Sequence, residues 1–230
     1  MGPLFQAFPD ALRMFFSWNR EVMDIVGLSF RVSTLSTFLA SLMSIPLGLS
    51  LFLSRFRGKP FLLQVVNSLM AMPTVVIGLL VYGVLSRQGP LGPLGLLYTP
   101  GAIVIGEVIM ALPIITALTY AAFEGLDPRV RRTALTLGAT LWSSSWVMIR
   151  EARYALLAAV GAGFGRVLSE VGSALMVGGN IRGYTRTMTT AIALETNKGE
   201  FSQALLLGML LLVLALSINV LVRKSLRRRS

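Results

Sequence analysis

Residues 164–187 read FGRVLSEVGSALMVGGNIRGYTRT, an apolar, glycine-rich run that is interrupted by Arg166 and Glu170. A charged side chain at bilayer depth costs about 2.5–3.5 kcal/mol on insertion scales. Two charges one helical turn apart therefore need a polar destination. The stretch predicts a membrane helix whose charged face lies along a transport path.

The composition of the whole chain supports a membrane setting. Hydrophobic residues make up 54% and charged residues 13%, and the mean hydropathy is +0.73. Five segments reach the roughly 20 apolar residues that a spanning helix needs. They are 32–54, 61–86, 101–123, 154–178 and 201–222. We expect an all-α polytopic membrane protein with five transmembrane helices in a single domain, 1–230.

Basic residues indicate the orientation of these helices. Most of the 21 Lys and Arg residues fall in the loops at 54–60 and 124–153 and in the C-terminal tail. The positive-inside rule then predicts an external N-terminus and a cytoplasmic C-terminus in the cell (inner or plasma) membrane. The N-terminal segment, 1–30, lacks the features of a secretory signal, and its apolar residues recur near helical spacing, as in a helix lying on the outer interface. These residues are Leu12, Phe15, Phe16 and Met23.

Several functional classes are excluded by what the sequence lacks. There is no Cys and no His, which excludes disulfides, thiolate or imidazole metal sites and histidine-activated nucleophiles. The phosphate loop GxxxxGK[ST] is absent, because Gly58-Lys59 is followed by Pro60. We expect no catalytic residue, metal or cofactor. The net charge of +11 reflects topology and lipid contact, not nucleic-acid binding.

Proline interrupts the second predicted span at Met72-Pro73-Thr74. A proline in a membrane helix frees a backbone carbonyl that must find another partner. Two interpretations stay open here, a kink that accommodates a neighbouring helix and a bend that lines a pore.

The cytoplasmic loop at 124–153 predicts two short helices. Asp127 is a candidate N-cap before Pro128, and Gly138 suits the left-handed residue that ends a helix. The second helix carries Trp142 and Trp146 on one face. This surface suits a partner's groove, and the alternative is an interfacial hairpin with its tryptophans among lipid headgroups.

The loop resembles the EAA loop of permease subunits of ATP-binding-cassette importers, specifically the molybdate and tungstate group. It reads RTALTLGA over 132–139, so Ala134 and Gly138 match the pattern, while Arg132 replaces the glutamate. Glu151 stands where the family usually has a distal proline. The run SEVGSALMVGGNI over 169–181 is most similar to tungstate permeases.

The loop that follows carries groups suited to a tetrahedral dianion. Thr185, Thr187, Thr189 and Thr190 offer four hydroxyls near two arginines, Arg182 and Arg186. A solvated external turn is the alternative interpretation.

The charged face of 154–178 has its own alternatives. Arg166 and Glu170 are spaced to pair with each other, with symmetry mates or, for Arg166, with Glu107 of the third span. Gly161 and Gly165 permit close helix approach, which places this helix near the axis of a homodimer. We assign Glu170 to gate structure in preference to anion binding, since a carboxylate repels an anion.

The resemblance implies a permease of an ATP-driven oxyanion importer for tungstate or molybdate. Its partners would be a second copy, two cytoplasmic ATPase subunits that bind ATP and Mg, and an external substrate-binding protein. The residues expected to couple to the ATPase are Asp127, Arg132, Ala134, Gly138, Trp142 and Trp146. The residues expected to line the path or form the gate are Glu107, Arg166, Glu170, Asn180, Thr185, Arg186 and Thr187. The competing classes are a secondary transporter that relays protons through Glu107 and Glu170 and, more weakly, a membrane scaffold.

Overall fold

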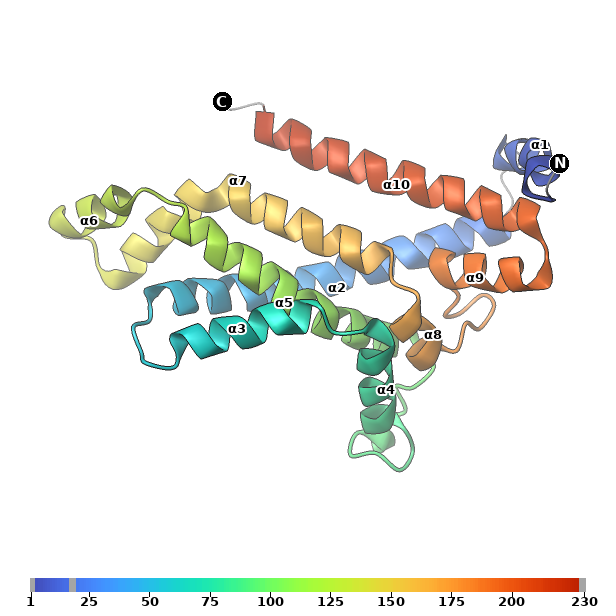
Figure 1. Ribbon diagram of the computed structural model, residues 1–230, viewed down its shortest axis with the longest axis horizontal. Coiled ribbons are helices and arrows are strands. Elements are labelled where there is room, and N and C mark those ends of the chain that lie inside the picture. The colour runs from blue at the N-terminus through green and yellow to red at the C-terminus, as the bar shows by residue number, and fades with distance from the viewer. Residues whose placement is uncertain (1–2, 17–19, 228–230) are drawn as a thin grey trace.

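Long helices lying side by side form the body of the molecule (Figure 1). The structure, a computed structural model, describes residues 3–16 and 20–227, and this part of the chain contains helices and turns but no strand. The helices that run along the bundle are α2 (Arg20–Leu53), α5 (Pro100–Glu124), α7 (Leu141–Leu168) and α10 (Phe201–Arg227).

The all-α prediction is confirmed. Within the described residues, α2, α5 and the Phe201–Val220 part of α10 are each long and apolar enough to cross a membrane. Two further pairs of helices pass the same test together but are sharply bent, which gives five spans if each pair counts as one. The first predicted span begins earlier than 32, because α2 starts at Arg20.

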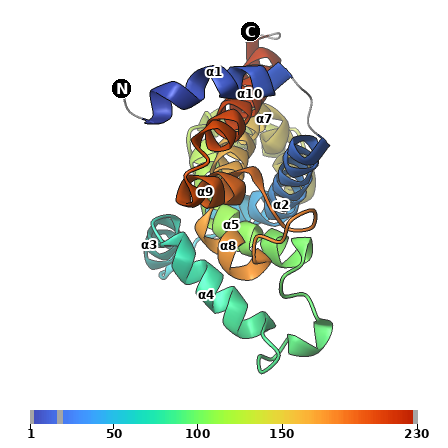
Figure 2. The ribbon, with the colours of Figure 1, turned by 90° about the vertical axis from the view of Figure 1, so that its right-hand side faces the viewer.

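The second predicted span is not one helix, which corrects the expectation for 61–86. It consists of α3 (Lys59–Met70) and α4 (Thr74–Leu85), whose axes differ by 97°. Pro73 has no N–H to continue α3, and it disfavours helical backbone at the preceding residue. The chain therefore breaks at Ala71–Pro73 instead of kinking, and α4 leaves the bundle sideways (Figures 1 and 2).

Helix α4 packs against α8 (Gly172–Gly178), the short helix that follows α7. A Cβ atom on Gly78 would lie 2.8 Å from the Cα atom of Ser173, so only glycine permits this approach. Tight packing of this kind fixes the direction in which α4 leaves the bundle.

The fourth predicted span is also broken. Helix α7 ends at Leu168, and α8 continues after a 60° bend. At its other end α7 begins at Leu141, so Trp142 and Trp146 belong to this long helix. The prediction of a second short helix in the 124–153 loop is therefore wrong.

Small residues let α2 and α5 approach closely. A buried face of α2 is rich in serine, and the Ser44 hydroxyl donates to the Leu112 carbonyl at 3.0 Å. A Cβ atom on Gly48 would lie 2.6 Å from the Thr119 methyl. Apolar side chains of α2, α4, α5, α7 and α8 form the adjoining core.

The two ends of the bundle differ. The short helix α6 (Pro128–Thr136) and the α2–α3 turn lie at one end, where the predicted cytoplasmic cations of these loops gather (Figure 1). Helices α1 (Pro3–Phe16) and α9 (Met188–Lys198) lie at the other. Helix α1 buries Ala7 and Ala11, contacts α10 and exposes Leu12. Parts of the predicted interfacial segment (1–2 and 17–19) and of the basic tail (228–230) lie outside the described residues.

Candidate gate and coupling surface

Glu170 forms the joint between α7 and α8. Its Oε2 atom lies 3.0 Å from Nη1 of Arg166 on α7, which confirms the predicted pairing of these side chains. Its Oε1 atom accepts the backbone N–H of Ser173 in the first turn of α8 at 2.9 Å. The carboxylate is buried with 2% of the side chain exposed, whereas the Arg166 side chain is 37% exposed. Both oxygens of a buried charge are thus occupied, as burial requires.

The joint also holds α9. The Thr189 hydroxyl donates to the Glu170 carbonyl at 2.5 Å. Thr187 caps α9 together with Thr190 in a reciprocal capping box. One residue, Glu170, therefore joins three helices through its two carboxylate oxygens and its carbonyl.

The other polar residues after α8 are engaged in local structure. The Thr185 hydroxyl donates to the Gly178 carbonyl at 2.6 Å and accepts the Ile181 N–H at 2.9 Å. Asn180, in the left-handed region with φ +50°, donates to the Thr190 carbonyl at 3.4 Å. Thr185 and Thr187 are 0% and 4% exposed, so the alternative of a solvated turn is wrong for them.

Glu107 lies in the N-terminal third of α5 and is 3% exposed. It faces Ser36 of α2 and lies close enough to Glu170 for the two carboxyl groups to interact. Its Oε2 atom has no hydrogen-bond partner among the described residues. The candidate Glu107–Arg166 pair does not form, because the Arg166 guanidinium is directed at Glu170.

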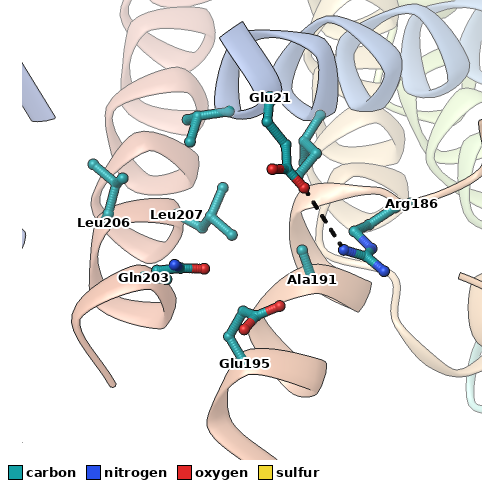
Figure 3. Close-up of a pocket in the computed structure, with 9 residues that line it drawn as sticks. Glu21, Arg186, Ala191, Glu195, Gln203, Leu206 and Leu207 are labelled. Carbon is teal, nitrogen blue, oxygen red and sulfur yellow. Dashed lines mark ion pairs between the residues drawn. The ribbon is translucent and has the colours of Figure 1, made fainter. Parts of the chain in front are cut away.

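A second ionic cluster connects the 181–187 loop to α2. Arg182 binds Glu21 of α2 through Nε at 2.7 Å and Nη2 at 2.5 Å, and Nη1 of Arg186 lies 3.9 Å from the same carboxylate. Figure 3 shows the Arg186 fork directed at Glu21, with Glu195 of α9 nearby. The small pocket between them has a volume of about 50 Å³ and is also lined by Gln203, Leu206 and Leu207.

This clasp, defined as Glu21, Arg182 and Arg186, was not predicted from the sequence. Glu21 and Arg182 are separated by 161 residues, so no local pattern relates them. The bond to Glu21 raises the pKa of Arg182, so this guanidinium keeps its charge.

The candidate coupling surface consists of α6 and the start of α7. The Asp127 side chain accepts the Arg129 N–H at 2.8 Å, and Gly138 ends the turn after α6 with φ +84°, which confirms the predicted cap and left-handed residue. Ala134 is buried against α7, while Arg132 is exposed. An apolar ridge projects beyond them, made of Leu137 (83% exposed), Leu141 (71%), Trp142 (85%) and Trp146 (60%).

The sequence and the fold of the chain match known transport proteins. Residues 36–230 match the family model described as binding-protein-dependent transport system inner membrane component. The chain belongs to this family. It is a multi-pass permease subunit of an ATP-binding-cassette importer and not an enzyme.

Curated relatives place the permease in the tungstate and molybdate group. It is 38% identical to a tungstate uptake system permease protein of Peptoclostridium acidaminophilum, over 94% of this chain and 95% of the relative. It is 37% identical to a tungstate uptake system permease protein of Campylobacter jejuni, over 96% and 92%. A molybdenum transport system permease of Azotobacter vinelandii is 30% identical over 78% and 83%.

Solved structures share the fold. A chain of a bacterial ABC transporter involved in the import of the acidic polysaccharide alginate superposes with a TM-score of 0.77 at 18% identity, covering 96% of the permease and 84% of that chain. A chain of an amino acid ABC transporter gives 0.68 at 19% identity, covering 90% and 94%. At this identity the likeness concerns the fold alone.

Proposed function

We propose that this permease imports a tetrahedral oxyanion, with tungstate as the first candidate and molybdate as the second. The two tungstate permeases that cover more than nine-tenths of the chain support this choice of cargo. The drive would come from two cytoplasmic ATPase subunits that bind ATP and Mg. An external binding protein would deliver the anion. The similar alginate ABC transporter is known in complex with an alginate pentasaccharide-bound periplasmic protein, which supports such a partner.

The observation that carries the mechanism is the continuity of α7. This single helix of 28 residues begins at the apolar ridge, with Trp142 in its first turn, and ends beside Glu170. At 1.5 Å per residue it is about 40 Å long. A displacement of its cytoplasmic end by a docked ATPase is therefore transmitted to the α7–α8 joint by one rigid element.

The coupling contact is assigned to the α6 region and the ridge. Asp127, Ala134 and Gly138 hold the shape of α6, while Arg132, Trp142 and Trp146 are exposed for a partner. ATP-driven closure of the ATPases would favour one of two packings of the helices over the other. The closure moves the α6 region and the ridge but not the outer end of the bundle.

The gate is assigned to the joint and the loop beyond it. Arg166 and Glu170 hold the bend, Asn180 and Thr185 shape the turn after α8, and Thr187 starts α9. Glu107 lies beside the joint. Contact of Arg186 with the anion stays a prediction. Its Nη1 atom lies 3.9 Å from the Glu21 carboxylate.

The permease would work as a homodimer with the small-residue face of α7 near the axis. A Cβ atom on Gly165 would meet nothing within 4 Å, and Ala158, Ala162 and Ser169 are exposed on the same side. Small residues permit two such helices to approach closely in lipid.

Vesicle transport tests the proposed function. Permease and ATPase are reconstituted with the binding protein outside, and tungstate uptake is measured after ATP depletion with a proton gradient intact, then with ATP present and the gradient collapsed. We expect uptake to require ATP and to survive loss of the gradient. Uptake that follows the gradient would instead support proton coupling through Glu107 and Glu170.

A further inference from the structure

Arg87 is an isolated cation in an unusual position. It is the only Lys or Arg between Lys59 and Arg129, and it follows α4, which leaves the bundle sideways (Figure 1). The side chain is exposed, and in the described part of the chain it makes no ion pair. A guanidinium in this state keeps all of its donors for a ligand.

A hollow of about 620 Å³ surrounds this cation. Its lining includes Arg87, Gln88, Tyr82 and Tyr98, and no Asp or Glu is among the described residues that line it. The guanidinium fork, the Gln88 amide and the phenols are hydrogen-bond donors. Such a set provides positive charge and several donors without a competing carboxylate.

Tyr98 forms one wall of the hollow, and its own backbone conformation is strained. Its φ is +62°, which is rare for a bulky residue, and its N–H donates to the Val177 carbonyl of α8 at 2.9 Å. Its ring packs over Gly179 and makes an edge contact with the Tyr82 ring, at 6.4 Å between centroids. Strain that surrounding contacts maintain is typical of functional sites.

The Tyr98 phenol stays a neutral donor. A hydrogen bond with Tyr82 raises the pKa of Tyr98, so Tyr98 keeps its proton at neutral pH. The arginines of the clasp offer a poorer site, because Arg182 and Arg186 both face Glu21.

We propose that the hollow at the α4–α5 connection is the first receiving site for the tetrahedral oxyanion, with Arg87 as its charged ligand and Gln88, Tyr82 and Tyr98 as neutral donors. This inference rests on the proposed function. It adds the place where the cargo first contacts the permease, ahead of the joint at Glu170.

The test is the KM for tungstate in reconstituted vesicles. Arg87→Gln should raise the KM about tenfold or more, the range expected when one charge-assisted hydrogen bond is lost. The KM of Arg87→Lys should fall between those of the wild type and Arg87→Gln, since lysine keeps the charge but not the planar fork. Arg20→Gln removes another exposed cation and should keep the wild-type KM. Equal KM values for Arg87→Gln and Arg20→Gln would overturn the proposal.

Lipid phosphate shares the chemistry of the cargo, so the assay is run in phosphatidylcholine vesicles and again with phosphatidylglycerol added. The same KM ratio in both supports a cargo site. An effect confined to the anionic vesicles would assign Arg87 to a lipid headgroup and contradict the proposal.

A second measurement keeps this inference separate from the proposed function. Tungstate, molybdate and sulfate are each tested for a thermal shift of the purified permease. We expect tungstate to stabilise the wild type and not Arg87→Gln. If wild-type vesicles fail to import tungstate, the proposed function fails, and the absence of any Arg87-dependent shift with the three anions would overturn the receiving site as well.

Discussion

At the scale of single residues, Glu170 shows how a buried charge can be structural. Its carboxylate is bound by a guanidinium on one side and a backbone N–H on the other, and its carbonyl receives a threonine hydroxyl. Each partner comes from a different helix, so the residue defines the relative positions of α7, α8 and α9.

Removing Arg166 alone should therefore lower the free energy of unfolding more than removing both charges of the pair. Breaking a buried pair costs about 3–5 kcal/mol, and the 37% exposure of the Arg166 side chain reduces this to about 2–3 kcal/mol for Arg166→Ala. Arg166→Ala combined with Glu170→Gln should be milder, since no charge is left unpaired. Thermal unfolding of the solubilised permease measures both. Equal losses in the single and double variants would show that the pair does not hold the joint.

Residue roles that depend on sequence neighbours could be predicted. Roles that depend on contacts between distant parts of the chain could not. Asp127 and Gly138 were predicted because a cap and a left-handed turn depend on neighbours a few residues away. The clasp of Glu21 with Arg182 depends on folding across 161 residues, and the threonines after α8 were assigned to a ligand or solvent because their burial has no signal in sequence. Arg87 was counted only as one of the external cations.

At the scale of elements, the breaks in two predicted spans matter most. Hydropathy measures the length of an apolar run and carries no information about its direction, so both bent pairs read as single spans. Pro73 indicated a bend but not one of 97°. The α7–α8 bend has no proline and depends on tertiary contacts. The Glu170 carboxylate accepts the Ser173 N–H of α8, and Gly78 of α4 permits the close approach of Ser173.

Gly138→Val tests the coupling element. A β-branched residue at φ +84° is strained by about 1–2 kcal/mol, although a Cβ atom there would meet no neighbour within 4 Å. We expect weaker co-purification with the ATPase and less substrate-stimulated hydrolysis. Gly83→Ala is the control, because its site is also open and its φ is not positive. Normal ATPase binding and stimulation in Gly138→Val would argue against this docking surface.

Across the whole molecule, the proposed coupling surface and the proposed gate lie at the two ends of α7. The remaining long helices, α2, α5 and α10, surround this connection, and the basic loops gather at the coupling end (Figure 1). We propose that α7 carries the movement from the ATPase to the gate as one unbroken helix.

Distances across the proposed homodimer provide the test. The chain contains no Cys, so Ile181→Cys, which replaces an exposed residue after α8, gives one spin label per copy without a background from the permease. Double electron–electron resonance then compares the assembled complex with and without a non-hydrolysable ATP analogue. We predict that the label distance shifts with the analogue. The shift should be retained in Ala155→Ser and lost in Ala155→Pro, because proline interrupts α7 at an exposed position near its middle while the ATPase stays bound. A full shift in Ala155→Pro, or none in the unsubstituted helix, would contradict it.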